Sequence, residues 1–452
     1  DVIVDQDGNR ALVQALADSY LMALALDPVN IRAGTRYMLP TEPYRLAIGD
    51  HLFGRVINAI GEPIDGKKRF PDGDTPLVLD ADVPGIDVRE PVKEQLYTGC
   101  TLVDTLLPIA KGQRQLIFGG DHAGKSAFLI DVVRHQKAPE NICIYVLIGK
   151  SASELARVSS EIMDNNESKV IIVAALSDQL PPRIAIAPSI AFTIAEYFQR
   201  QGKDVLVILD DLDAHAKYLR EIALLEERLP GRESYPGDLF YQQAHLMERS
   251  GTFVKSSGGG SITTLPVVAT GVENFSSIIP TNLMSCTDGH LMFLPELQGE
   301  GIYPAINEER SVTRMGRQTQ TLTQKQLSSR VRMHLSRYRQ QKEYSQFSVQ
   351  LRPEVRAALQ LGEVLEHALR QNPADTIPAD VQVPLVALTL TTFVQENDLA
   401  FFVRHKEAMR AAIETDPGLQ ELRAGARSGM ELDAYLSLLE TKRPVFENIC
   451  HE

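Results

Sequence analysis

The segment GGDHAGKS at residues 119–126 has the residue types and the spacing of a phosphate-binding loop. It matches the pattern G-x-x-x-x-G-K-[S/T], whose fixed positions are Gly119, Gly124, Lys125 and Ser126. Glycines let backbone N–H groups surround a phosphate, the lysine reaches the β- and γ-oxygens, and the serine hydroxyl can hold Mg²⁺. We therefore expect a nucleotide phosphate to bind here.

The variable positions of the same loop are predicted to line the nucleotide as well: Gly120, Asp121, His122 and Ala123. His122 could contact a phosphate through its ring. The simpler interpretation, which we favour, is that His122 occupies a variable position of the loop and has no specific role.

An acidic partner for the metal follows an apolar run further along the chain. VLVILDDLD (205–213) predicts a buried strand that ends in Asp210 and Asp211. A strand-end carboxylate is the usual partner for the water shell of Mg²⁺ in phosphate-loop proteins. The predicted metal site is therefore Ser126 together with Asp210.

Hydrolysis also needs a group that orients the attacking water. The position expected to supply this group is occupied by a positively charged residue. The strand CIYVLIG (143–149) is followed by Lys150, which cannot act as a base unless its pKa is greatly lowered. Glu154 is a nearby carboxylate, although a glutamate in SASELARV is more often a solvated helix residue. The sequence thus favours a site that binds nucleotide without turnover.

One arginine could act on a nucleotide bound to a neighbouring subunit. Arg314 lies in SVTRMG (311–316), after a segment rich in glycine and proline. An exposed arginine there could reach the site of a neighbouring subunit and stabilise charge at the γ-phosphate. From the local pattern alone, an ordinary surface arginine is equally compatible.

The elements that must position these residues alternate between strands and helices. An apolar strand, QRQLIFG (113–119), enters the loop, and an amphipathic helix, SAFLIDVVRHQ (126–136), leaves it. Further apolar runs at 143–149, 169–176 and 204–211 predict strands covered on both faces. This pattern indicates an α/β domain with a mainly parallel sheet.

We predict three regions from the changes in pattern along the chain. Residues 1–50 carry short alternating segments that predict a small β unit, and residues 51–320 form the nucleotide-binding α/β domain. Residues 321–452 are poor in glycine and have helical periodicity, which predicts a helical bundle.

Composition narrows the possible partners of the chain. A net charge of −13 argues against a nucleic-acid surface, and four scattered cysteines suggest neither a zinc site nor a disulfide framework. No apolar run approaches the length of a membrane span, and no secretory leader is visible. We expect any membrane association to run through partner subunits.

Several strings in the sequence resemble the alpha subunit of F-type ATP synthases. In chain order, these strings are GDHLFGRVINAIGEPIDG (49–66), PGIDVREPV (84–92), the phosphate loop, LPGRESYPGDLFY (229–241), GSITTLPVV (260–268), IIPTNLMSCTDGHLMF (278–293) and SVTRMG. IPTNLMSCTDGH in particular is similar to alpha rather than to the catalytic beta subunit.

The resemblance implies a P-loop NTPase (RecA-like) core with a partial N-terminal β-barrel and a C-terminal α-helical bundle. Alpha and beta subunits of that family alternate in a ring around a central gamma shaft, with a peripheral stalk and delta subunit. Beta catalyses, whereas alpha holds Mg-ATP or Mg-ADP without turnover and supplies an arginine, here Arg314, to the beta site. It also implies a peripheral protein on the cytoplasmic face of the bacterial inner membrane.

The sequence departs from the family pattern at the nucleotide site. Alpha subunits usually read GDRQTGKT at the loop and carry glutamine where this chain has Lys150. Tyr303, in GIYPA, replaces the arginine found near the adenine, and Gln371 is the plausible counterpart of an adenine-side glutamine. These changes suggest a divergent bacterial paralogue. Compared with the family, the N-terminal barrel is also expected to be short.

Two other functions remain open on sequence alone. A homo-hexameric ATPase of the secretion or flagellar export type shares this core and would need a carboxylate such as Glu154. A ring-shaped RNA translocase would need a basic, aromatic-rich module, which the acidic balance disfavours.

Overall fold

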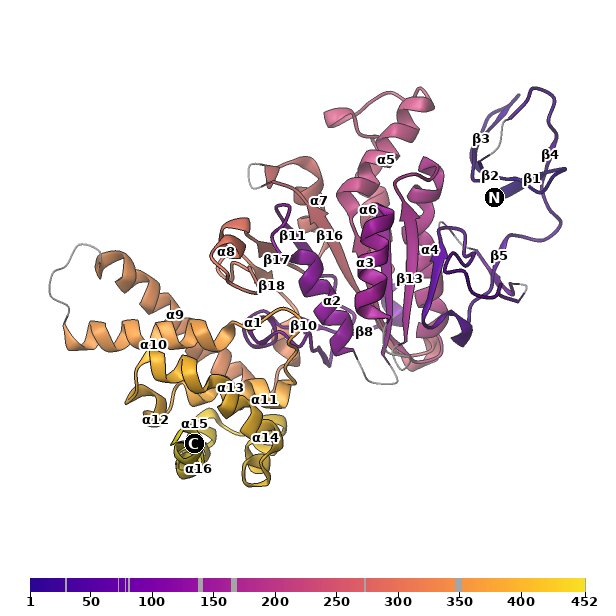
Figure 1. The fold of residues 1–452 in the computed structure, drawn as a ribbon. Helices are drawn as coiled ribbons and strands as arrows, with labels where there is room; N and C mark the ends of the chain where they lie inside the picture. The colour runs from indigo at the N-terminus through magenta and orange to yellow at the C-terminus, as the bar shows by residue number, and fades with distance from the viewer. Residues whose placement is uncertain are drawn as a thin grey trace. The chain divides into compact units, whose positions relative to one another are not determined.

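The computed structural model describes most of the 452-residue chain as two compact units (Figure 1). The described residues are 1–28, 31–71, 73–77, 79, 82–136, 141–163, 169–271, 274–345 and 352–451. The first unit comprises Asp1–Val92, Lys111–Asp121 and Gln136–Phe293, and the second comprises Lys93–Ala110, His122–His135 and Leu294–Glu452. Each unit is built from several segments of the chain.

A parallel sheet forms the centre of the first unit, in the strand order β17-β11-β16-β14-β12-β13-β6. The strands are β6 (Arg55–Asn58), β11 (Leu116–Gly119), β12 (Asn141–Lys150), β13 (Val170–Leu176), β14 (Asp204–Asp210), β16 (Ser261–Ala269) and β17 (Gly289–Phe293). Most of their side chains are buried, because apolar runs such as these are covered on both faces. The sequence-based expectation of a parallel α/β sheet is confirmed.

Helices and a short antiparallel ribbon surround this sheet. α3 (Ala152–Ile162) packs on β12 and β13, and α4 (Pro181–Gln199) packs on β12, β13, β14 and α5 (Leu212–Leu225). α6 (Leu239–Glu248) packs on α7 (Ile278–Cys286), and β15 (Gly251–Phe253) pairs antiparallel with both β16 and β8 (Arg89–Glu90).

The N-terminal part of the first unit is an antiparallel sheet of order β3-β2-β1-β4. Its strands are β1 (Val2–Asp5), β2 (Arg10–Leu16), β3 (Leu21–Ala25) and β4 (Tyr37–Met38), and a separate ribbon pairs β5 (Arg45–Leu46) with β7 (Thr75–Pro76). Figure 1 shows these strands in indigo. The sequence predicted a small β unit here; the partial barrel stays a prediction.

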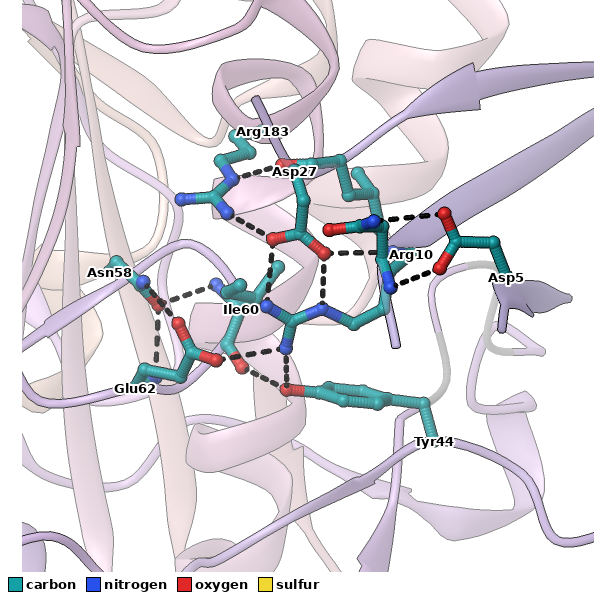
Figure 2. A network of polar contacts seen from close by, with 10 residues as sticks. Asp5, Arg10, Asp27, Tyr44, Asn58, Ile60, Glu62 and Arg183 are labelled. Atoms are coloured by element: carbon teal, nitrogen blue, oxygen red, sulfur yellow. Dashed lines mark hydrogen bonds and ion pairs between the residues drawn. The ribbon is translucent and has the colours of Figure 1, made fainter. Parts of the chain in front are cut away.

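Two arginines converge on Asp27 and fasten the N-terminal sheet to α4 (Figure 2). Arg10, on β2, donates from Nε and Nη2 to the two oxygens of Asp27 at 2.8 Å each, and Arg183, on α4, donates from Nη2 at 2.6 Å. Arg10 also pairs with Glu62 at 2.9 Å. The charge-assisted hydrogen bonds therefore join segments that are far apart in sequence.

The second unit is mainly helical. It contains β9 (Gln95–Leu96), α1 (Thr101–Leu106), β10 (Ile109–Ala110), α2 (Lys125–His135), α8 (Pro295–Gly299) and β18 (Val312–Thr313). The later helices are α9 (Leu322–Ser345), α10 (Pro353–Leu369), α11 (Ala379–Leu388), α12 (Thr392–Gln395), α13 (Leu399–Thr415), α14 (Gln420–Ser428), α15 (Leu432–Thr441) and α16 (Arg443–His451).

α11 is the central helix of this bundle. All of its residues are buried, and it packs on α1, α10, α13, α14 and α15. Its side chains are mostly apolar around the whole circumference, so other helices must cover it, which explains this position. Within the described ranges, no helix is both long and apolar enough to cross a membrane.

Candidate nucleotide-binding site

The carboxyl ends of the parallel strands form one edge of the central sheet. β11 ends there at Gly119, β12 at Lys150 and β14 at Asp210. Ligands of open α/β sheets bind at this edge, because the loops that follow the strands project from it. The strand order, which separates β11 from β14 by β16 alone, therefore assembles residues that are 91 positions apart in the sequence.

Gly119 is required by the close approach of two backbones. Its φ is 155°, and a Cβ at this position would overlap the carbonyl oxygen of Phe293 on β17. β11 and β17 pair residue for residue here, with Gly119 opposite Phe293. The first glycine of the motif thus lets the strand pass its neighbour as it turns into the loop.

The loop continues with exposed polar residues and then enters α2. Asp121 and His122 are exposed, and His122 adopts a left-handed backbone conformation with a φ of 58°. Gly124 is also left-handed, at a φ of 84°. Exposure on a left-handed turn fits the interpretation of His122 as a permitted variable position.

Lys125 is the first residue of α2 and is buried, and Ser126 follows it half-buried. Backbone N–H groups at a helix N-terminus have no partner within the helix, and the helix dipole is positive there. A phosphate at this end of α2 would meet both the dipole and a lysine. Ala123, just before it, is buried and contributes only its backbone.

Lys150 forms two ion pairs at the end of β12. Its Nζ lies 3.0 Å from Oδ1 of Asp210 and 2.9 Å from Oδ2 of Asp211. The hydroxyl of Tyr145 donates to Oδ2 of Asp210 at 3.0 Å, and the backbone N–H of Ala214 donates to Oδ1 of Asp211 at 2.6 Å. Every oxygen of the two carboxylates therefore has a partner.

The electrostatics of this cluster keep the lysine protonated. Burial alone would lower the pKa of Lys150, but the adjacent charges of Asp210 and Asp211 raise it above its usual range. A group with a raised pKa cannot accept a proton from water at neutral pH. The structure thus agrees with the expectation that no base stands at this position.

Glu154 has a local structural role at the start of α3. Its backbone N–H donates to Oγ of Ser151 at 3.2 Å, and its carboxylate accepts the N–H of Ser151 at 3.3 Å. This reciprocal pair is a capping box, which satisfies free N–H groups at the first turn of a helix. The one carboxylate offered for an independently active enzyme is therefore committed to a helix cap.

Tyr303 and Gln371, the predicted adenine-side residues, lie together in the second unit. The backbone N–H of Gln371 donates to the carbonyl of Tyr303 at 3.1 Å, and the Tyr303 hydroxyl donates to Asp131 of α2 at 2.6 Å. The Gln371 side chain accepts from the N–H of Thr101 and donates to the carbonyls of Gly99 and Asp375. Both buried side chains therefore already have polar partners inside the protein.

Arg314 is exposed on a turn that is fixed by its neighbours. No hydrogen bond or ion pair joins its side chain to another residue in the described parts of the chain. Thr313 donates from Oγ1 to the carbonyl of Pro108 at 2.7 Å, and a Cβ on Gly316 would overlap the same carbonyl oxygen. A free guanidinium thus projects from a fixed backbone.

Two family models match the chain. The nucleotide-binding domain of the ATP synthase alpha/beta family matches residues 99–313, and the C-terminal domain of ATP synthase alpha/beta chains matches residues 320–436. The ATP synthase subunit alpha 1 of Dinoroseobacter shibae is 38% identical over 445 residues, which are 98% of this chain and 85% of the relative. The chain belongs to the ATP synthase alpha subunit family.

Other members of the family match over slightly shorter ranges. The ATP synthase subunit alpha of Dictyoglomus turgidum is 37% identical over 386 residues, 85% of this chain and 76% of the relative. The ATP synthase subunit alpha 1 of Rhodopirellula baltica is 37% identical over 362 residues, 80% of this chain and 72% of the relative. The resemblance seen in the sequence is confirmed.

Membership of the alpha family includes a nucleotide-binding domain, so ATP or ADP is the ligand class of this site. The roles of the individual loop residues, of Tyr303 and Gln371, and of Mg²⁺ at Ser126 and Asp210 stay predictions. Among the described residues no group of three or more His, Cys, Asp or Glu side chains is arranged to hold a metal ion.

Sequence reasoning missed several residues that shape this alpha-type site. Tyr145 and Asp131 make contacts that no sequence motif indicated. Asp211 was predicted only to lie at the end of a strand, and in the structure it pairs with Lys150. No sequence pattern indicated a role for Pro108, because its role depends on a contact with Thr313, 205 residues away.

Proposed function

We propose that this chain is the non-catalytic, nucleotide-holding alpha subunit of an F-type rotary ATP synthase. It alternates with a catalytic beta subunit in a hexameric ring, and it helps to couple ATP synthesis or hydrolysis on beta to ion transport through a membrane sector. The observation that carries the proposal is Lys150, whose ammonium is ion-paired at the place where a catalytic carboxylate would stand.

Lys125 and the backbone N–H groups of residues 119–126 hold the phosphates in this proposal. Tyr303 and Gln371 shape the adenine side from within the second unit, through their contacts to α2 and α1. Ser126 remains the proposed Mg²⁺ ligand, whereas the Asp210 carboxylate is already paired with Lys150. Nucleotide therefore stabilises the subunit and is not consumed by it.

Arg314 is the residue that we assign to the neighbouring beta site. Its exposure, its lack of an ion pair within the described chain and its fixed turn suit a guanidinium that acts outside its own subunit. Such an arginine stabilises the negative charge that develops on the γ-phosphate, and this contribution is worth on the order of 10³–10⁵ in rate.

Further partners and location follow from this assignment. A gamma-type shaft would pass through the ring, and a delta subunit or peripheral stalk would hold it. The ring would then lie on the cytoplasmic face of a bacterial inner membrane, attached through these partners. The division of the chain into residues 1–50, 51–320 and 321–452 is likewise our proposal.

The experiment is reconstitution of the complex with a beta-type partner and either Arg314→Ala or Arg317→Ala. Arg317 is the matched control, since it is exposed in the same segment but binds Ser329 of its own chain at 3.2 Å. We expect Arg314→Ala to assemble normally and to lower ATP turnover at least about 100-fold, while Arg317→Ala changes it by less than about twofold. Mg-ATPase turnover by the purified chain alone, lost in Lys125→Ala, would refute the proposal.

A further inference from the structure

A lysine occupies the acidic end of β14, where the alpha family implies Mg²⁺. Lys150 is the last residue of β12, and β12 pairs in parallel with β14, with Leu147 opposite Asp210. The lysine therefore lies three residues beyond the last register pair, and its side chain crosses back to the carboxylates. The parallel pairing brings the ends of the two strands side by side, and the Lys150 side chain makes the contact.

Each oxygen of the two carboxylates that a metal would need already has a partner, and one of those partners is a cation. Asp210 accepts from Lys150 on Oδ1 and from Tyr145 on Oδ2, and Asp211 accepts from the N–H of Ala214 on Oδ1 and from Lys150 on Oδ2. Mg²⁺ requires near-octahedral oxygen ligands and keeps most of its waters, which must themselves donate to such carboxylates. The donor set at Asp210 does not fit this requirement.

The lysine is held in place by burial. The side chains of Lys150, Asp210 and Asp211 are 17%, 7% and 8% exposed. Withdrawing the ammonium would leave two buried carboxylates without a countercharge, which is strongly unfavourable. A cation fixed 3.0 Å from Asp210 also repels a divalent cation that approaches the same carboxylate.

We infer that Lys150 replaces Mg²⁺ as the cation of the nucleotide site, so that this subunit binds nucleoside diphosphate or triphosphate independently of Mg²⁺. The inference rests on the proposed nucleotide-binding function and specifies the form of its ligand. The lysine neutralises the acidic end of β14, and the phosphates depend on Lys125 and the backbone N–H groups.

The decisive measurement is ADP affinity of the purified full-length chain by calorimetric titration, in EDTA and in millimolar MgCl₂. We expect the two dissociation constants to agree within about threefold. A Mn²⁺ titration followed by electron paramagnetic resonance gives a second readout without turnover. We expect no Mn²⁺ to bind together with ADP.

Two variants of the same residue test whether Lys150 is the cause. Lys150→Gln introduces the residue that alpha subunits usually carry and removes the charge, whereas Lys150→Arg keeps the charge as a matched control. We expect Lys150→Gln to bind ADP at least about tenfold more tightly with Mg²⁺ than without it. Lys150→Arg should remain indifferent to Mg²⁺.

These measurements distinguish a failure of the Mg²⁺ inference from a failure of the proposed nucleotide site. Tenfold tighter binding to the wild-type chain with Mg²⁺, or Mn²⁺ bound with ADP, overturns this inference and leaves the nucleotide site intact. A Lys150→Gln chain that stays indifferent to Mg²⁺ overturns the role of Lys150. If folded wild-type protein binds no ADP in either buffer, the proposed nucleotide site fails and the inference with it. If Lys150→Gln does not fold, the ADP and Mn²⁺ titrations of the wild-type chain still show whether nucleotide binding depends on a divalent cation.

Discussion

The hydroxyl of Tyr303 donates a 2.6 Å hydrogen bond to Oδ2 of Asp131, on the helix that begins with Lys125 of the phosphate loop. Asp131 also accepts the backbone N–H of Ala374 at 3.1 Å. Burial, together with the adjacent Asp131 carboxylate, raises the pKa of Tyr303 above its usual range. The tyrosine that replaces an arginine of the alpha pattern is therefore a structural link within the second unit.

Tyr303→Phe should destabilise the protein while leaving nucleotide binding nearly unchanged. The variant keeps the ring but removes one of the buried donors to Asp131, which costs about 1–3 kcal/mol. We expect the thermal unfolding midpoint to fall by about 2–4 °C or more, measured by calorimetry, with ADP affinity changed less than about twofold. Tyr20→Phe, at an exposed tyrosine, is the control. Equal midpoints for both variants would contradict the structural link.

Gln371→Ala should act more severely on stability than on binding. Its side chain makes hydrogen bonds to Thr101, Gly99 and Asp375, and alanine would leave the partners at Thr101 and Gly99 buried without it. Unsatisfied buried groups cost about 1–3 kcal/mol each, so a clear drop in the unfolding midpoint is expected. Gln318→Ala, at an exposed position, should change the midpoint little. A loss of ADP affinity at unchanged stability would instead make Gln371 a direct nucleotide contact.

The Asp27 cluster should give stability that is lost in acid. Burial alone would raise the pKa of Asp27, but the hydrogen bonds from Arg10, its charge and the bond from Arg183 lower it to about 2. A lowered pKa means that the stabilisation is complete above the unfolded-state value near 4 and disappears as pH falls toward 2. The midpoint of Asp27→Asn should therefore lie below wild type at pH 5 and approach it near pH 2.

The control for this pH dependence is Asp18→Asn, at an exposed carboxylate. Its difference from wild type should be small at every pH. If the Asp27→Asn difference were constant between pH 5 and 2, the two arginines would not be supporting the charge of Asp27.

Gly316→Ala should lower turnover of the assembled complex without removing any charge. The added Cβ would overlap the carbonyl oxygen of Pro108. It would therefore displace the turn that carries Arg314 and disrupt the hydrogen bond from Thr313 to Pro108. Misplacing a catalytic group by about 1 Å can cost on the order of 100-fold in rate. ATP turnover with a beta-type partner provides the measurement.

Gly299→Ala is the matched control for this glycine, because a Cβ there meets nothing within 4 Å. It should leave turnover unchanged. If Gly316→Ala turned over ATP as fast as Gly299→Ala, the position of Arg314 would not depend on Pro108.

The family, the phosphate loop and the strands that lead to it could be inferred from sequence patterns without a structure. GGDHAGKS and the apolar runs are local patterns, since loop chemistry depends on neighbouring residues and buried strands are continuously apolar. The same reasoning recognised that Lys150 could not be a base. These conclusions needed no knowledge of which strands are neighbours.

The contacts that these residues make depend on the tertiary fold. Lys150 meets Asp210 because β12 and β14 pair in parallel, and Tyr303 meets Asp131 across 172 residues of chain. Pairings over such distances depend on how strands and helices pack, and no local pattern encodes them. The departures from the alpha pattern could be listed from the sequence, but only the fold gave Lys150 and Tyr303 their partners.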